Sequence, residues 1–112
     1  PYAQAIVANG MLFTSGQLPI DIATGEMPKT AVEQAAASLN NLKALVQAAG
    51  ASMDDVIKTT VFIKNMDDFA AINDVYAQYF HEPFPARCCV EVARLPKDAL
   101  IEIECIALLN KA

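Results

Sequence analysis

The segment 85–104 constrains the fold of this chain more than any other part of it. It holds two stretches rich in Val and Ile around Leu95-Pro96-Lys97-Asp98, where Pro and Asp interrupt a β-ladder. We predict an antiparallel pair of strands with Ala93 opposite Leu100. Because strand side chains alternate between faces, one face is then polar and carries Arg87, Cys89, Glu91, Glu102 and Glu104. The other face is predicted to point toward the helices and the core, and carries Cys88, Val90, Val92, Ile101, Ile103 and Cys105.

The predicted polar face has two interpretations. It could be a solvated surface on which Arg87 forms a salt bridge to Glu91 or Glu104, since exposed ion pairs are common and contribute little to stability. It could instead hold an arginine that binds a carboxylate next to a glutamate that handles water or protons. The spacing of the residues leaves both interpretations open.

The N-terminal third of the chain predicts a hairpin. Strands at 2–8 and 11–17 flank Asn9-Gly10, a dipeptide typical of a type I′ turn. The register sets Ala8 against Met11, Ile6 against Phe13 and, at the open end, Tyr2 against Gln17. The turn-rich stretch 19–28 is expected to be a loop.

Two helices are predicted from capping signals and helical periodicity. The first begins at the capping box Thr30-Ala31-Val32-Glu33 and ends at Gly50, with Gln34 and Ser38 on its solvent side. The second follows the capping side chains of 65–68, and its aromatic stripe is interpreted as core rather than as a stacking platform.

The order of elements predicts an α+β fold, a mixed β-sheet with two helices packed on one face. Strands are expected at 55–64 and 100–109, and the last is apolar enough on both sides to be central. The uncovered face of the sheet would carry Ile6, Phe13, Phe62, Leu100, Ile106 and Leu108. Exposure of this much apolar area is unfavourable, so a partner is expected to cover it.

Composition narrows the class of protein. A chain of 112 residues is one domain, 1–112, and its 54% hydrophobic content is high for its size. Thirteen acidic and eight basic residues give a net charge of −5, which disfavours nucleic acid as a partner. One histidine and three cysteines predict no metal site, and the odd cysteine count favours a reducing, cytoplasmic location. No apolar run is long enough to span a membrane.

Several blocks together resemble one known family. Pro85-Ala86-Arg87, the run 89–98 and Ile101-Glu102-Ile103-Glu104 are similar to the signature of the RidA/YjgF family, the reactive-intermediate imine deaminases. Further matching blocks are Pro1-Tyr2, Thr14-Ser15-Gly16-Gln17 with Thr24-Gly25-Glu26, Lys58-Thr59-Thr60-Val61-Phe62, Asp68-Phe69-Ala70 and Asn73. The resemblance runs through the whole chain in order. It also suggests that a segment ahead of Pro1 is missing. The connection 81–85 has fewer residues than is usual in the family, either through a genuine deletion or because residues of the loop are missing from the sequence.

The resemblance implies a chorismate-mutase-like fold and a homotrimer with a central β-barrel, whose active sites lie in clefts between subunits. It implies hydrolysis of reactive 2-imino acids, and of their enamine tautomers, to 2-oxo acids and ammonia without a cofactor. A different class of function is also open, in which the trimer binds 2-oxo acids as a non-catalytic sensor or chaperone-like protein. An RNA-directed activity, reported for some relatives, is disfavoured by the acidic composition.

The same resemblance assigns candidate site residues. Arg87 would bind the substrate carboxylate, and Glu102 would position or activate water, so these two are the expected catalytic residues. Cys89 would line the pocket rather than act as a nucleophile, because no base is expected beside it. The other expected substrate-binding residues are Tyr2, Ser15, Gly16 and Asn73.

Overall fold

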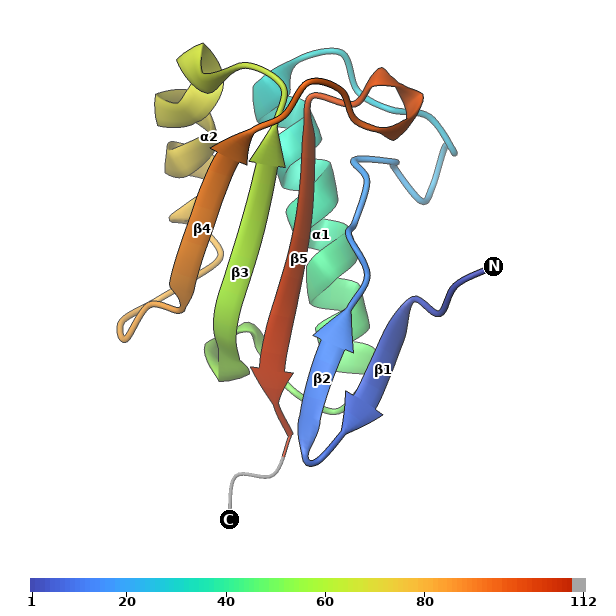
Figure 1. Cartoon of the computed structure of the whole chain (residues 1–112), viewed down its shortest axis with the longest axis vertical. Coiled ribbons are helices and arrows are strands. Elements are labelled where there is room, and N and C mark those ends of the chain that lie inside the picture. Colours follow the sequence, from blue (N-terminus) through green and yellow to red (C-terminus); the bar gives the residue numbers. More distant parts are fainter. Residues whose placement is uncertain (110–112) are drawn as a thin grey trace.

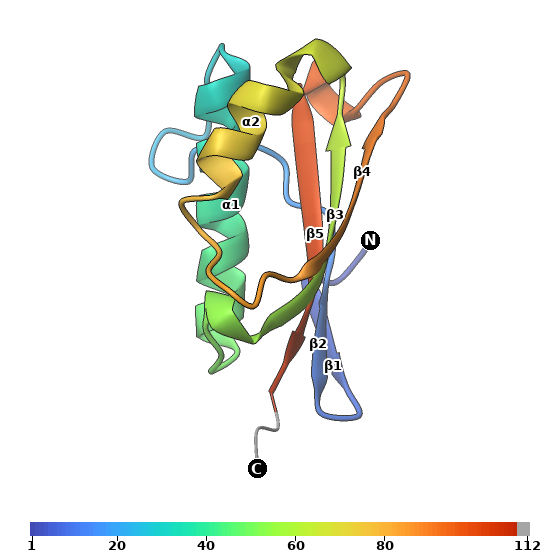
Figure 2. The same ribbon diagram turned by 90° about the vertical axis from the view of Figure 1, so that its left-hand side faces the viewer.

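A computed structural model describes residues 1–109 and shows one mixed sheet with two helices on one of its faces (Figures 1 and 2). The strands are β1 (Ala5–Ala8), β2 (Met11–Thr14), β3 (Val56–Ile63), β4 (Ala86–Glu91) and β5 (Ile101–Leu108). The helices are α1 (Ala31–Ala48) and α2 (Phe69–Tyr76), with short 3-10 turns at Met53–Asp55, Met66–Asp68 and Pro96–Asp98. The sheet order is β1-β2-β5-β3-β4, so the predicted α+β architecture and the central position of the last strand are confirmed.

The N-terminal hairpin forms in the predicted register. Ala8 pairs with Met11 and Ile6 with Phe13, around a turn in which Asn9 and Gly10 have φ angles of 54° and 76°. The strands are shorter than predicted, because Gln17 leaves the hairpin and donates its backbone N–H to the carbonyl of Ile103 at 2.7 Å. The expected pairing of Tyr2 with Gln17 is therefore wrong.

The predicted antiparallel pair of β4 with β5 is also wrong. β4 runs parallel to β3 at the edge of the sheet, with Arg87 level with Thr59, while β5 is antiparallel between β2 and β3. The segment between β4 and β5 passes over the end of β3, helped by positive φ angles at Lys97 and Asp98. Figure 1 shows this crossing at the top of the sheet. Turn residues between two strands indicate where the first strand ends. They do not indicate whether the next strand pairs with the first or crosses to another place in the sheet.

Helix α1 begins as predicted, with the Thr30 hydroxyl accepting from the Glu33 N–H at 3.1 Å. Its buried apolar stripe consists of Ala35, Leu39, Leu42 and Val46. Gln34 and Ser38 were expected on the solvent side and are instead 4% and 0% exposed.

The burial of Gln34 has a clear cause. Its Nε2 donates to the Pro28 carbonyl at 2.8 Å and its Oε1 accepts from the Leu100 N–H at 2.8 Å. The side chain thereby ties the loop before α1 to the start of β5. A buried amide is tolerated when both of its polar ends are satisfied in this way.

Strand β3 departs from strict alternation near its start. The sequence pattern predicts Ile57 on the same face as Thr59 and Ile63, and Val56 on the opposite face. A register irregularity between Val56 and Lys58 instead leaves Val56 buried and Ile57 exposed. From Thr59 onward the alternation holds, so Thr59, Val61 and Ile63 pack beneath the helices. No helix among the described residues is both long enough and apolar enough to cross a membrane.

We predict that Gln34→Leu lowers the free energy of unfolding by about 1–3 kcal/mol, because the partly buried N–H of Leu100 loses its acceptor. Urea unfolding followed by circular dichroism measures the change. Gln47→Leu, on the exposed side of the same helix, is the control and should stay within about 0.5 kcal/mol of the parent. Equal effects of the two substitutions would contradict the bridging role of Gln34.

Candidate functional site

Arg87 lies on edge strand β4 and faces helix α2. Its Nη1 donates to Oδ1 of Asn73 at 2.7 Å. Its guanidinium carbon lies 4.8 Å from the centre of the Tyr76 ring and 5.4 Å from that of Phe69. Because residues four and seven positions apart share one side of a helix, Phe69, Asn73 and Tyr76 all meet Arg87 from α2. The structure thus brings together two of the predicted site residues, Arg87 and Asn73.

A hollow of about 410 Å³ opens beside this guanidinium. Its walls are Asn73, Tyr76, Ala77, Phe84, Pro85 and Arg87. The lining thus combines one cation, one amide and an apolar surface. Such a lining suits a small molecule that carries a carboxylate and a short apolar portion.

Cys89 lies two residues farther along β4 and points to the same side of the sheet as Arg87. It is half-buried, and burial raises the pKa of its thiol above the usual value, while the nearby Arg87 opposes this. A thiol that stays protonated is a poor nucleophile, and Cys89 is not among the residues that line the hollow beside Arg87. Cys88 is exposed on the opposite side, so its predicted orientation toward the helices is wrong.

Glu102 lies on β5 and points away from the helices, to the uncovered face of the sheet. Burial, and to a lesser extent the neighbouring Glu104, raise the pKa of its carboxyl above the usual value. The carboxyl lies directly against Gly16: a Cβ built on that glycine would be 2.1 Å from Oε1 of Glu102. Only a residue without a side chain leaves room for the Glu102 carboxyl at this position, so the structure brings Gly16 and Glu102 together.

Arg87 and Glu102 do not meet within one chain. Pairing places Arg87 level with Thr59 and Glu102 level with Phe62, on opposite faces of the sheet and two strands apart. Standard strand spacings then put their Cα atoms roughly 14 Å apart. The single polar face predicted for Arg87, Cys89, Glu91, Glu102 and Glu104 is wrong, because the first three point toward the helix side and the last two point away from it.

The alternative interpretation, a salt bridge from Arg87 to Glu91 or Glu104, does not hold either. Glu91 uses Oε1 to accept from the Met66 N–H at 2.8 Å, and Glu104 lies on the other face. Within residues 1–109, the salt bridge that forms joins Arg94 and Asp98 at 2.8 Å. The guanidinium of Arg87 thus contacts aromatic rings and an amide rather than a carboxylate.

The other predicted site residues cluster on the Glu102 side of the molecule. Gly16 contacts Glu102, and the neighbouring Ser15 donates its hydroxyl to the Ala3 carbonyl at 2.6 Å. Tyr2 is 75% exposed. Arg87, Asn73 and Cys89 thus form one group, and Glu102 with Gly16 and Ser15 forms a second.

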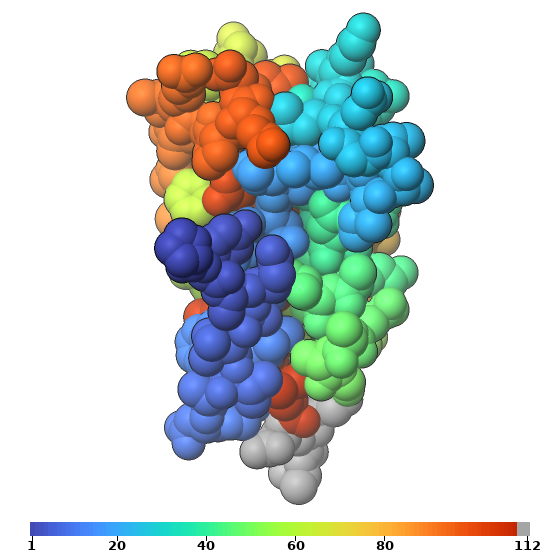
Figure 3. Space-filling model, turned by 90° about the vertical axis from the view of Figure 1, so that its right-hand side faces the viewer, coloured from blue at the N-terminus to red at the C-terminus, as the bar shows by residue number. Residues whose placement is uncertain are grey.

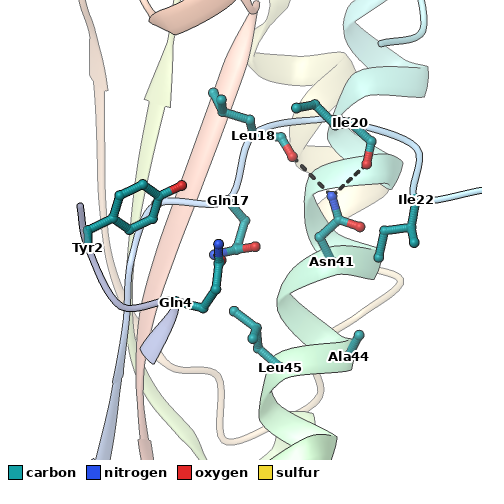
Figure 4. Close-up of a pocket in the computed structure, with 10 residues that line it drawn as sticks. Tyr2, Gln4, Gln17, Leu18, Ile20, Ile22, Asn41, Ala44 and Leu45 are labelled. Atoms are coloured by element: carbon teal, nitrogen blue, oxygen red, sulfur yellow. Dashed lines mark hydrogen bonds between the residues drawn. The ribbon is translucent and has the colours of Figure 1, made fainter. Parts of the chain in front are cut away.

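A second hollow, of about 390 Å³, lies between the N-terminal segment, the stretch after β2 and helix α1 (Figures 3 and 4). Its wall includes Tyr2 and Gly16 but neither Arg87 nor Glu102. Nδ2 of Asn41 donates to the carbonyls of Leu18 and Ile20 at 3.1 and 2.8 Å. The Asn41 amide thus holds the stretch after β2 against α1.

Tyr76 and Phe69 were missed as site residues. Both belong to the aromatic stripe that was interpreted as core, and Tyr76 is indeed buried. Their spacing, two helical turns apart on the side that also carries Asn73, was the available signal. Among the residues described, no group of three or more His, Cys, Asp or Glu side chains is placed to hold a metal ion.

Comparison with known proteins identifies the family of the chain. Residues 1–109 match the family model described as endoribonuclease L-PSP. A RutC family protein of Pyrococcus horikoshii is 57% identical over 96% of this chain and 86% of that protein. The 2-iminobutanoate/2-iminopropanoate deaminase of Escherichia coli is 52% identical over 96% of this chain and 87% of that protein.

Solved structures show the same fold. The crystal structure of E. coli TdcF with bound serine superposes with a TM-score of 0.93 at 52% identity, covering 98% of this chain and 89% of that one. The E. coli yjgF gene product also gives a TM-score of 0.93, at 50% identity and the same coverage. Sequence and structure together show that the chain belongs to the RidA/YjgF family.

Proposed function

We propose that this protein hydrolyses 2-imino acids, together with their enamine tautomers, to 2-oxo acids and ammonia. The observation that carries the proposal is the presence of two half-sites: a held guanidinium beside a small hollow, and a carboxyl with a raised pKa on the other face of the sheet. The name of the E. coli relative, an imine deaminase, supports the same reaction.

Arg87 would bind the substrate carboxylate. Its hydrogen bond to Asn73 uses one of the five N–H groups of a guanidinium, so a bidentate grip on a carboxylate remains open. A guanidinium already held by Asn73 and the aromatic rings loses less freedom on binding than a free side chain does. A serine molecule, which also carries a carboxylate, is bound in the crystal structure of TdcF.

Glu102 would act on the C=N carbon. Its carboxylate takes a proton from a water molecule as the water oxygen bonds to that carbon, giving a tetrahedral carbinolamine. With the imine nitrogen protonated at the outset, return of this proton to nitrogen creates an ammonium leaving group, and Glu102 takes up the hydroxyl proton as the C–N bond breaks, so that ammonia leaves and the C=O of the 2-oxo acid forms. Partial burial of Glu102 brings its pKa nearer to neutral pH, where one group can both take up and release a proton.

The two half-sites would come together between copies of the chain. Since Arg87 and Glu102 lie on opposite faces of one sheet, one substrate can reach both only if they belong to different chains. The uncovered face of the sheet exposes Ile6, Phe13, Val90 and Leu108, an apolar surface that a further copy would bury. A homotrimer with its sheets in a central barrel satisfies both requirements.

The alternative function is a non-catalytic trimer that binds 2-oxo acids in the same clefts. Binding and turnover separate the two functions. Tight binding of a 2-oxo acid without any acceleration of imine hydrolysis would favour the sensor and end the catalytic proposal.

Arg87→Ala should lower kcat/KM for imine hydrolysis by roughly ten- to a hundredfold, the range expected for loss of one charge-assisted hydrogen bond. An amino acid oxidase supplies 2-iminopropanoate, and ammonia release is measured above the uncatalysed rate. Arg94→Ala, which breaks only the exposed pair with Asp98, is the matched control and should leave the rate unchanged. If both variants keep the parent rate, Arg87 has no part in catalysis.

Mixing two inactive variants tests whether the site is shared. Arg87→Ala and Glu102→Gln chains, co-expressed with different tags and purified through both, form mixed trimers. In a cyclic trimer of either composition one interface joins an intact Arg87 to an intact Glu102, so activity should return to about one third of the parent value. No activity above the two single variants would show that the site lies within one chain.

The pH profile should depend on Glu104. A raised pKa means that Glu102 takes up a proton at higher pH than an ordinary glutamic acid, so its base form and the activity are lost earlier as the pH falls. Glu104→Gln removes one cause of the shift and should move the acid limb of kcat/KM to lower pH, while burial still holds it above the usual position. Glu26→Gln, in the exposed loop, should leave the limb in place.

A further inference from the structure

Tyr76 packs in the core and also contacts the guanidinium of Arg87. Its ring is 6% exposed and packs against Phe80, with ring centres 4.6 Å apart. Its other neighbour is the guanidinium of Arg87, 4.8 Å from the ring centre. A cation over an aromatic ring is attracted to the ring's negative face, most strongly where water is excluded. The ring of Tyr76 therefore supports the group that reaches the hollow.

The orientation of this ring is itself held. The Tyr76 hydroxyl and the Thr59 hydroxyl share a hydrogen bond of 2.8 Å. Thr59 is fully buried on β3 and stands level with Arg87 in the parallel pairing. A short chain of contacts thus leads from β3 through α2 to β4. Burial raises the pKa of the Tyr76 phenol, so its O–H stays intact at neutral pH.

We infer that Tyr76, held by Thr59, is a positioning residue that presents Arg87 to the substrate carboxylate. The inference rests on the proposed function and adds a residue that acts through Arg87 rather than on the substrate. Asn73 holds one N–H of the guanidinium while the Tyr76 ring supports the guanidinium plane. Together they restrict a side chain that would otherwise sample many rotamers.

A matched control for this role lies just after the end of α2. Tyr79 follows on the same aromatic stripe and is half-buried, and its hydroxyl also makes a hydrogen bond, to Asn40 at 2.8 Å. Its contacts lie toward α1 rather than toward Arg87. Replacing Tyr79 therefore removes a comparable phenol without touching the guanidinium.

Tyr76→Leu should raise KM for the 2-imino acid, and the Kd for 2-oxobutanoate measured by calorimetry, by roughly two- to fivefold, as expected for loss of a cation–π contact to an exposed guanidinium. kcat should change little, since the ring does not touch the reacting atoms. Tyr76→Phe keeps the ring and loses only the Thr59 bond, so its effect should be smaller. Tyr79→Leu should leave KM and Kd at parent values, and thermal melts check that each variant folds.

A double-mutant cycle separates positioning from general stability. In the Arg87→Ala background, Tyr76→Leu should cause no further loss of 2-oxobutanoate affinity, because the group it supports is already absent. A further loss equal to that in the parent background would overturn the inference. So would a Tyr76→Leu protein that binds and turns over like Tyr79→Leu.

A readout that needs no turnover keeps the two proposals distinguishable. Side-chain ¹⁵N relaxation of Arg87 Nε reports how restricted the guanidinium is. Tyr76→Leu should increase its motion, whereas Tyr79→Leu should not, and equal motion in both variants would overturn the inference. If Arg87→Ala leaves imine hydrolysis intact while this relaxation difference is seen, the proposed function fails and the positioning of Arg87 by Tyr76 stands as a structural fact.

Discussion

The parallel pairing of β4 with β3 is the constraint on which the candidate site depends. It sets Arg87 level with Thr59, and Thr59 lies beneath α2, so the guanidinium is directed at that helix. An antiparallel pairing of β4 with β5 would have turned Arg87 to the side of Glu102. The side chains that hold Arg87, namely Asn73, Phe69 and Tyr76, all belong to the helix that follows β3. The order of the strands thus determines which side chains contact the Arg87 guanidinium.

Much of the architecture was accessible from the sequence because it is encoded locally. Asn9-Gly10 determines the hairpin register, and Thr30 with Glu33 marks the start of α1, since both signals act over a few residues. The apolar pattern of the last strand predicts a central strand, and β5 is indeed paired on both sides, with β2 and with β3. These features follow from turn chemistry, capping and hydrophobic pattern alone.

The site was only partly accessible, since it depends on which distant strands pair. The Val- and Ile-rich stretches around Pro96 are equally compatible with a hairpin and with a crossover. Side-chain alternation places Arg87 and Glu102 on the same face in the predicted hairpin, but on opposite faces in the observed crossover. Burial of Gln34 was missed for the same kind of reason, because its partners Pro28 and Leu100 come from separate parts of the chain. The role of Tyr76 was hidden because a buried aromatic residue also has an ordinary explanation.

The sheet divides its two faces between different tasks. The face under α1 and α2 holds the core and, at its β4 edge, the guanidinium with its aromatic support. The other face combines exposed apolar side chains with the partly buried Glu102. A face of this composition is suited to contact with another protein surface, which would enclose the carboxyl further and strengthen its electrostatic interactions.

The Glu102 carboxyl lies against the backbone of the loop that contains Gly16, with no side chain between them. Any side chain at position 16 would compete with the carboxyl for the same space. A related sequence could thus retain both the arginine and the glutamate and yet have alanine at position 16. The added methyl group would then displace the glutamate carboxyl. In such a relative the proposed carboxylate-binding arginine would remain while the proposed acid–base group was displaced, so that ligand binding would persist without the proposed hydrolysis.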